Sequence, residues 1–324
     1  MPGRWDVEAV AARLRAHPGL RDKAGIGLVT EVLGATDWAH GPGDDGAVVE
    51  VGGLVLTVGG EAMAPAFVAR DPFGAGAAAV LANVNDLAAM GAVPLAIVDT
   101  VVAPEPVARS VLEGMRHASV VYDVPVVGGH LTVRDGPASV SAFGLGRVRE
   151  ANRVLSVRNA AAGQRLMLAC VTEGRMREDF PFFASFAERG DRLAADVRLL
   201  ADVADRGACV AAKDVSMAGI VGSTAMLVEC QGLGVTIDLE AVPRPPGADL
   251  VTWLLAFPCY GFLLCVPPGR EEECARPFRD RAIEVAVIGT LDDTGVVAVT
   301  AAGARPAVVV DLAAEPVTGL SGTG

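Results

Sequence analysis

Short apolar runs rich in valine and isoleucine, each bounded by Gly, Pro or Asp-Gly, recur in two sets along this chain and predict β-strands. The first set is "AVVEV", "LVLTV", "LAIVDTVVA", "VPVV" and "ASVSAFGLGRV", between residues 47 and 148. Two stretches among them, about 74–90 and 105–122, have the apolar spacing of helices. A second set opens at "GQRLMLACV" and repeats the theme. The pattern predicts mixed α/β structure.

The segment "REANRVLSVRNAAAG", in which arginines and small residues replace the apolar pattern, separates the two sets. It predicts a boundary near residues 150–158, with an N-terminal domain over 1–152 and a C-terminal domain over 153–324. A chain of 324 residues with 52% hydrophobic residues is long enough for two buried cores.

Composition also argues against several classes of partner. The net charge of −12 disfavours nucleic acid and anionic membranes, whose binders display a basic face. The longest apolar run, Val251–Val266, contains Pro258 and Gly261 and is shorter than the roughly 20 residues of a membrane span. The N-terminal "MPGRWDVEAVAARLRAHPG" is typical of an amphipathic helix and not of an export signal. We therefore expect a cytoplasmic protein whose six cysteines, which form no C-x-x-C pair, are reduced core thiols.

The helix expected within "PFGAGAAAVLANVNDLAAMGAVP", residues 72–94, carries an unusual polar pair. Asn83 and Asp86 are three residues apart and share one face of an otherwise apolar helix. A solvated polar strip is the plain explanation. However, such strips normally contain Lys, Glu or Arg, and this segment has none. A carboxylate among Ala, Val and Met is costly to bury unless a cation or hydrogen-bond donors neutralise it.

Two glycine-flanked motifs precede or end strands in the first half. In "GPGDDGAVV", residues 41–49, Asp44 and Asp45 stand side by side, which fits either a polar turn or a cation site. Adjacent residues entering a strand point to opposite sides, so both acids can serve one ion only if the glycines bend the chain. In "VPVVGGHLTV", Gly128 and Gly129 would let the backbone approach a ligand beside His130, although a Gly-Gly turn alone is weak evidence.

The segment "AAKDVSMAGIVGSTAMLVEC", residues 211–230, predicts a strand followed by a helix. Lys213, one of only two lysines in the chain, precedes Asp214 and a nearly side-chain-free helix start that includes Gly219. Exposed N–H groups, the positive end of the helix dipole and an ammonium would together form a phosphate site. The alternative is that Asp214 or Ser216 simply caps the helix.

Five acids stand beside Gly, Ala or a strand end and have no simple structural explanation. Mg²⁺ takes oxygen ligands and bridges carboxylates to substrate phosphates, so a nucleotide held in this way requires no basic patch. The acids are Asp44, Asp45, Glu61, Asp86 and Asp214.

These segments, in this order, resemble the AIR synthase superfamily, which includes aminoimidazole ribonucleotide synthetase, thiamine-monophosphate kinase, selenophosphate synthetase and the hydrogenase-maturation carbamoyl dehydratase. The similarity is greatest to the AIR synthase-related group. The matching segments are "GDDGAVV", "DPFGAGAAAVLANVNDLAAMGAVPLAIV", "VPVVGGHLTV" and "KDVSMAGIVG".

The resemblance implies an N-terminal α/β domain whose strands pair with a second subunit in a dimeric β-barrel, and a C-terminal α/β domain packed against it. ATP and Mg²⁺ would bind between the domains. By position, Asp44 and Asp45 match a Gly-Asp-Asp metal motif, while Asp86 and Asp214 match further acids of the site. Gly128, Gly129 and His130 match a nucleotide-contacting turn.

Two departures argue against the named activities. Where thiamine-monophosphate kinase has Thr-Thr-Asp this chain has "VGGEA", so Glu61 would replace the aspartate or the metal geometry would differ. Where that kinase has Gly-Gly-Glu-Asp-Tyr this chain has "FPCYGFLL", which removes two acids. The cysteine or selenocysteine motif of selenophosphate synthetase and the cysteine tail of the hydrogenase-maturation enzyme are absent.

The sequence thus predicts a homodimeric, Mg²⁺-dependent enzyme that uses ATP to phosphorylate or activate an oxygen of a small molecule. Lys213 and the amides of the following helix would stabilise charge on the transferring group, with Lys213 and Asp214 as catalytic residues. Asn83, Asp86, Gly128, Gly129, His130 and Gly219 are the predicted nucleotide contacts. The alternatives are a nucleotide-binding regulatory or scaffold subunit without turnover and a thiamine-monophosphate kinase-like enzyme.

Overall fold

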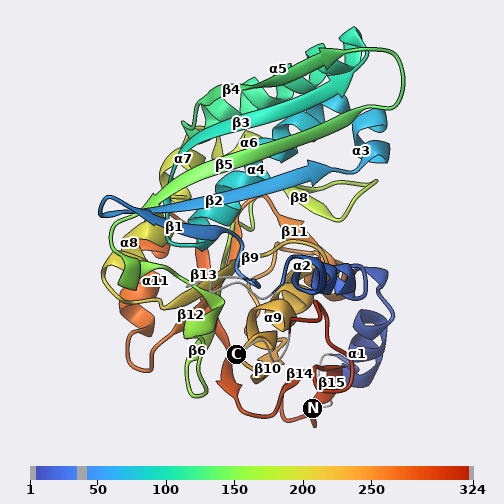
Figure 1. Ribbon diagram of the computed structural model, residues 1–324. Coiled ribbons are helices and arrows are strands. Elements are labelled where there is room, and N and C mark those ends of the chain that lie inside the picture. The colour runs from blue at the N-terminus through green and yellow to red at the C-terminus, as the bar shows by residue number, and fades with distance from the viewer. Residues whose placement is uncertain (1–4, 35–41, 321–324) are drawn as a thin grey trace. The chain divides into compact units, whose positions relative to one another are not determined.

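A computed structural model describes residues 5–34 and 42–320, so the first four residues of the predicted N-terminal helix and Gly41 lie outside the described part. The described chain forms two compact units (Figure 1). The five-stranded unit comprises Asp45–Val154 and Arg189–Asp202. The seven-stranded unit comprises the described residues of Met1–Asp44, Leu155–Glu188 and Val203–Gly324.

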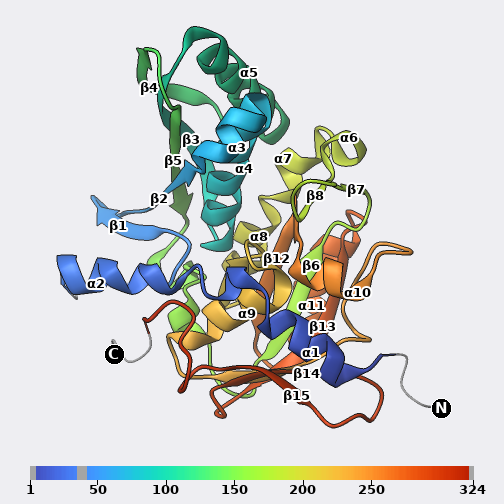
Figure 2. The same cartoon turned by 90° about the vertical axis from the view of Figure 1, so that its right-hand side faces the viewer.

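The five-stranded unit is one sheet covered by helices on a single face. Its strand order is β1-β2-β5-β3-β4, with β3 and β4 parallel and every other pair antiparallel. Figure 2 shows the helices α3, α4 and α5 together on one side of this sheet. The strands are β1 (Ala47–Val51), β2 (Leu54–Met63), β3 (Val93–Ala103), β4 (Val126–Val133) and β5 (Ser139–Val148), and the helices are α3 (Pro65–Arg70), α4 (Pro72–Ala89) and α5 (Glu105–Tyr122). All five predicted strands and both long helices of this half are confirmed.

Alternating burial shows which face of the sheet the helices cover. Val55 and Thr57 on β2, Ile97 and Val101 on β3, and Ala142 on β5 are buried against them. The two long helices approach so closely that a Cβ on Gly76 would lie 2.0 Å from the Val111 carbonyl oxygen, and one on Gly114 would lie 2.0 Å from that of Phe73. Because only glycine permits this contact, these positions fix how α4 lies on the sheet.

The opposite face of this sheet is apolar and exposed. The large side chains that register and alternation place there are 40–55% exposed, and they are Val49, Val51, Leu54, Val58, Val98 and Phe143. We call them the open face. The sheet has β1 and β4 as its two edges. The single chain therefore presents an open sheet, and not a closed barrel, in its described residues.

The seven-stranded unit is built on a mixed sheet of order β15-β14-β10-β13-β6-β12-β9. Only β10 and β14 are parallel neighbours. Its strands are β6 (Arg165–Cys170), β9 (Ala211–Asp214), β10 (Gly234–Asp238), β12 (Gly261–Val266), β13 (Glu284–Asp292), β14 (Val296–Thr300) and β15 (Ala307–Asp311). Its helices include α1 (Val7–Arg15), α2 (Gly27–Leu33), α9 (Gly219–Glu229), α10 (Leu250–Leu255) and α11 (Glu271–Arg279). The strand predicted at "GQRLMLACV" is present as β6, and the strand and helix predicted within residues 211–230 are present as β9 and α9.

The N-terminal helix α1 packs into this second unit. Its buried residues Val7, Val10, Ala11 and Leu14 belong to the same core as residues of β14 and β15. Asp6 begins the helix by accepting a hydrogen bond from the Ala9 N–H at 3.0 Å, and Arg15 at its end donates to the Val308 carbonyl. The start and the end of the described chain are thus joined in one core.

A smaller sheet of β7 (Arg175–Met176), β8 (Phe182–Ala184) and β11 (Phe257–Pro258) extends the second unit. The buried Phe183 packs edge-on against Trp253 at 5.2 Å between ring centroids. The sequence patterns did not predict these short strands, nor α2, α3, α11 and β15.

The segment Arg189–Asp202 belongs to the five-stranded unit although it lies in the second half of the sequence. It begins at the last residue of α6 (Phe186–Arg189), contains α7 (Arg192–Asp196) and ends within α8 (Leu199–Asp205), and it is held by polar contacts. Arg189 and Asp196 form an ion pair whose side chains are both 0% exposed. Arg198 donates to the carbonyl oxygens of Tyr122 at 3.1 Å and Asp123 at 3.0 Å, at the end of α5. The compact units are therefore discontinuous in sequence, whereas the predicted domains were two continuous segments.

Within the described ranges no helix is both long and apolar enough to cross a membrane. All six cysteines carry free thiols, and five of them are buried.

Candidate functional site

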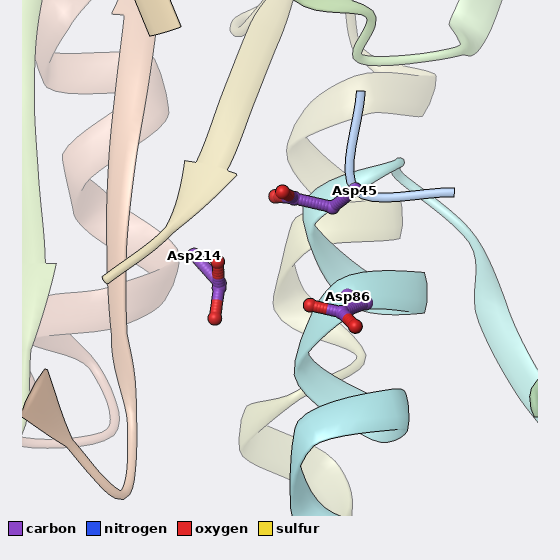
Figure 3. Close-up of side chains that lie close together, drawn as sticks. All are labelled: Asp45, Asp86 and Asp214. Carbon is purple, nitrogen blue, oxygen red and sulfur yellow. The ribbon is translucent and has the colours of Figure 1, made fainter. Parts of the chain in front are cut away.

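Two acids from the sequence motifs meet within the five-stranded unit. Asp45 lies just before β1 and Asp86 in the last turn of α4, and their carboxylate oxygens lie within 4.8 Å of each other (Figure 3). Both side chains are half-buried. Such a pair of oxygens suits a hard divalent cation, which relieves the repulsion between the two charges.

The backbone around Gly46 brings the two acids together. A Cβ on Gly46 would lie 3.3 Å from the Val58 carbonyl oxygen and 3.4 Å from Met90 Cγ, so the chain passes closely between β2 and the end of α4. Asp86 is one helical turn before Met90. The glycine after the acid pair thus allows Asp45 to reach the last turns of α4.

Asn83, on the turn of α4 before Asp86, has a structural role in this unit. It is 0% exposed, and its amide donates to the carbonyl oxygens of Ala79 at 2.9 Å and Ala142 at 3.1 Å. The bond to Ala142 fastens α4 to β5. Its predicted contact with a nucleotide stays a prediction.

The other predicted residues of this unit lie on two different faces of the sheet. Glu61 on β2 pairs with Ala142 on β5, so its side chain lies on the face of the sheet that α4 covers. His130 pairs with Thr100 and lies on the opposite, open face, where its Nε2 is 3.1 Å from the Thr132 hydroxyl. Within this unit the sheet separates His130 from Asp86.

The side chain of Asp99 explains why position 129 is a glycine, without the need for a bound ligand. A Cβ there would lie 2.6 Å from the Asp99 carboxylate oxygen Oδ2, so any larger residue would displace this side chain. Asp99 is 8% exposed, and its burial raises the pKa of the carboxyl group above its usual value. Gly128, its neighbour, is exposed. The nucleotide contacts predicted for the two glycines remain predictions.

Lys213 and Asp214 end the edge strand β9 of the seven-stranded unit. Both are buried, at 6% and 8% exposure, and they pair with Leu263 and Phe262 of β12. Lys213 lies near the Cys230 thiol. Burial raises the pKa of that thiol, while the charges of Arg158 and Lys213 lower it and those of Asp44 and Glu229 raise it. Lys213 and Asp44 therefore share one polar neighbourhood.

The sequence left open that Asp214 or Ser216 caps the helix that follows β9, but neither residue is its N-cap. Its N-cap is Ala218, without a side-chain hydrogen bond, and Ser216 instead accepts at its carbonyl from the Gly219 N–H at 2.6 Å. Gly219 has φ +72°, and a Cβ on it would lie 2.2 Å from the Leu254 carbonyl oxygen. Glycine is thus required at this position, and the N-cap residue of α9 supplies no side-chain hydrogen bond.

Asp44 differs from its neighbour Asp45. Its Oδ2 accepts a hydrogen bond from the Ser156 hydroxyl, and its Oδ1 accepts one from the Val157 N–H, each at 2.7 Å. All three residues belong to the seven-stranded unit. Sequence reasoning missed Ser156, which stands within the predicted linker and begins a short 3₁₀ helix, Val157–Asn159.

The segment "FPCYGFLL" is part of the core of the same unit. Cys259, Tyr260 and Phe262 are all 0% exposed, and the rings of Tyr260 and Phe262 meet edge-on at 4.9 Å. The segment contains no acid, in contrast to the Gly-Gly-Glu-Asp-Tyr sequence expected in the kinase.

Two family models together match most of the chain. Residues 43–148 match the family described as AIR synthase related protein, N-terminal domain, and residues 168–302 match its C-terminal domain. The chain belongs to the AIR synthase-related family. The sequence-based assignment to the AIR synthase superfamily is thereby confirmed.

Sequence relatives of this AIR synthase-related chain fall into two groups. An uncharacterized protein of Synechocystis sp. is 35% identical over 284 residues, covering 86% of this chain and 87% of that protein. An uncharacterized protein of Methanocaldococcus jannaschii is 27% identical over 218 residues, covering 66% and 67%. The phosphoribosylformylglycinamidine synthase subunit PurL of Synechocystis sp. is 29% identical over 278 residues, covering 77% of this chain but 36% of PurL.

Solved structures share the fold of this AIR synthase-related chain at low identity. T. maritima PurL complexed with ADP superposes with a TM-score of 0.76 at 17% identity, over 93% of this chain and 50% of PurL. AaThiL complexed with AMPPCP and TMP gives a TM-score of 0.66 at 20% identity, over 87% of this chain and 95% of AaThiL. The chain thus spans about half the length of the solved PurL and nearly all of AaThiL.

Proposed function

We propose that this protein is an Mg²⁺-dependent enzyme that uses ATP to phosphorylate or activate an oxygen of a small molecule. The observation that carries the proposal is the pair of half-buried acids, Asp45 and Asp86, with oxygens within 4.8 Å of each other. Mg²⁺ held by carboxylates would neutralise nucleotide phosphates without a basic surface. Family membership supports the nucleotide, because solved relatives carry ADP or AMPPCP.

Asp214 would be a further ligand of the cation, as the family resemblance implies. A hydrogen-bonded path within the seven-stranded unit supports this assignment. Asp44 binds Ser156, the carbonyl of the adjacent Leu155 accepts from the Ala212 N–H at 3.2 Å, and Ala212 lies two residues before Asp214. Asp44 and β9 are therefore connected within the seven-stranded unit.

The transferred phosphoryl group would lie at the start of α9. The first amides of this helix have no side-chain cap, and its dipole favours negative charge there. Lys213 precedes it on β9, although its buried ammonium also lies near Cys230 and Asp44. In this scheme Lys213 and the α9 amides stabilise the developing charge, while Glu61 supports the cation from the helix-covered face of the sheet.

A homodimer through the open face forms part of the proposal. The six exposed apolar side chains of that face would otherwise stay in contact with water, although monomers seldom leave such a patch uncovered. Two open sheets facing each other would bury this surface and give the dimeric barrel that the family resemblance implies.

A nucleotide-binding subunit without turnover is the second candidate. The largely buried "FPCYGFLL" segment and "VGGEA" in place of an aspartate motif favour it, because both remove acids that a kinase of this family would use. A thiamine-monophosphate kinase-like activity is a third candidate. The similarity of the fold to AaThiL supports it, whereas the same missing acids argue against it.

Calorimetric titration with ATP and Mg²⁺, followed by a phosphate-release assay over candidate small molecules, tests the proposal. The enzyme hypothesis predicts Mg²⁺-dependent ATP binding and release stimulated by one class of acceptor. Binding without turnover on any acceptor favours the second candidate. A protein that does not bind ATP in the presence of Mg²⁺ would contradict all three.

A further inference from the structure

A groove lies between α5 and the edge strand β4 of the five-stranded unit, two elements that are neighbours in Figure 1. Its volume is about 530 Å³, within the range of small-molecule sites. Leu131 and Val133 of β4 line it, and they pair with the buried Val101 and Ala103 of β3. The groove is therefore on the helix-covered side of the sheet, opposite to the open face.

The lining of this groove combines exposed apolar side chains with balanced charges. Leu131 and Val133 are 49% and 54% exposed. The remaining lining residues belong to α5, two of them apolar and four charged, and they are Ala108, Leu112, Glu105, Arg109, Glu113 and Arg116. Two acids and two bases leave the α5 side without net charge. Apolar surface therefore dominates the contact that the groove offers to a ligand.

The buried carboxyl group of Asp99 lies at one end of the lining strand. Gly129 pairs with Asp99 and is two residues before Leu131 on the same face of β4, which is about 6.6 Å along the strand. A Cβ at position 129 would lie 2.6 Å from the Oδ2 atom of Asp99. Because glycine has no side chain, residue 129 does not cover the carboxyl group at this edge of the sheet.

Asp99 makes no hydrogen bond or ion pair within the described ranges 5–34 and 42–320. It is only 8% exposed, and burial raises the pKa of its carboxyl group. A buried carboxylate without a partner is costly to the folded protein. Groups of this kind gather at binding sites, where a ligand supplies the missing partner.

The surroundings of Asp99 indicate which partner fits. A hard metal ion would need several oxygen ligands, whereas the lining next to this carboxyl group is apolar at Leu131 and Val133. A protonated amine instead supplies both a positive charge and hydrogen-bond donors from one small group. An apolar body attached to it would cover the exposed side chains of the groove.

We propose that this groove binds a small apolar amine, whose ammonium group bonds to the Asp99 carboxylate while its apolar part covers Leu112, Leu131 and Val133. The site goes beyond the proposed function, because it requires neither ATP nor Mg²⁺. It lies on the opposite side of the sheet from the open face, through which we propose the homodimer.

Two probes of similar shape, 4-phenylbutylamine and 4-phenylbutan-1-ol, test the proposal by calorimetry in chelator without nucleotide. The amine should bind the parent at least about tenfold more tightly than the alcohol, the effect of one charged hydrogen bond. Asp99→Asn should abolish this preference by weakening the amine alone. Asp135→Asn, which removes the same charge from an exposed loop, is the control and should keep the preference.

Leu131→Gln tests the apolar part of the site separately. It should weaken the amine and the alcohol alike and leave the preference for the amine unchanged. In spectra of the methyl-labelled parent, the amine should shift the signals of Leu112, Leu131 and Val133. Asp99→Asn should unfold at the parent temperature or above, because it replaces an unpaired buried carboxylate by a neutral group of similar shape.

Several results would overturn the proposal. They include equal affinity of the parent for the two probes, an unchanged preference in Asp99→Asn, and no binding of the amine at millimolar concentration. Signal shifts confined to residues outside the groove would place the amine elsewhere. A clear loss of stability in Asp99→Asn would show that the carboxyl group has a structural partner, which also contradicts the proposal.

Discussion

Replacing Asp86 by asparagine should have opposite effects on the stability of the metal-free protein and on its affinity for Mg²⁺. The carboxylates of Asp45 and Asp86 have oxygens within 4.8 Å, and without a cation they repel each other. At that separation two unit charges repel by about 0.9 kcal/mol in bulk water and about 3.5 kcal/mol at an effective dielectric constant of 20. Because both side chains are half-buried, the lower part of this range applies.

We therefore expect Asp86→Asn to unfold at the same or a slightly higher temperature than the parent when a chelator is present. Its Mg²⁺ affinity with ATP should fall by at least about 10- to 100-fold, the loss typical of even an indirect metal partner. Consequently, the stabilisation that Mg²⁺ and ATP give the parent should largely disappear in the variant.

Scanning calorimetry with chelator and with Mg²⁺ plus ATP measures both quantities on one sample. Asp135→Asn is the matched control, because it removes the same charge from an exposed loop between β4 and β5. It should keep the full response to Mg²⁺ and ATP. The reasoning would be refuted by a variant that is less stable than the parent in chelator by more than about 1 kcal/mol, a typical loss for a residue with a structural role.

Two further predictions concern other parts of the chain. Phe143→Glu, on the open face, should convert the homodimer to monomers, and light scattering measures the change in mass. Val120→Glu, at a 75% exposed position on α5, is the control and should leave the mass unchanged. A parent protein that is already monomeric contradicts the proposed dimer. Burial raises the pKa of the Cys265 thiol to about 12 from 9.0. At pH values between 9 and 12 unfolding therefore releases the proton of this thiol. The stability that the buried neutral thiol contributes is present below pH 9 and is lost as pH rises towards 12. The expected slope is about 1.4 kcal/mol per pH unit for this thiol, and Cys265→Ala should reduce it in denaturant titrations between pH 9 and 10.5; an unchanged slope contradicts the assignment.

Local patterns could be predicted from the sequence because they depend on near neighbours. The apolar spacing of residues 72–89 produced α4 as expected, and the alternating run 138–148 produced β5. The proximity of Asp45 to Asp86 followed from family resemblance and not from spacing. The distinction between Asp44 and Asp45 could not be predicted, because it depends on Ser156 and Val157, more than a hundred residues away.

Other long-range features also lie beyond what sequence patterns can predict. The sequence of residues 189–202 does not indicate that they pack with the first half of the chain. Arg189 and Asp196 are only seven residues apart, but the burial of their ion pair depends on residues distant in the sequence. His130 follows a Gly-Gly pair that suggested a ligand site, but strand register places it on the face away from α4. Register depends on pairing with β3, and a shift of one residue would reverse the outcome.

The packing of α1 beside β15 has a consequence for synthesis. The apolar side of α1 leaves the ribosome nearly 300 residues before its partner Val308, and at about 5–20 residues per second it waits roughly 15–60 s for that strand. The five-stranded unit, complete by residue 202, can fold during this interval. Nascent chains halted before β15 should accordingly hold a finished first unit and an N-terminal helix available to chaperones.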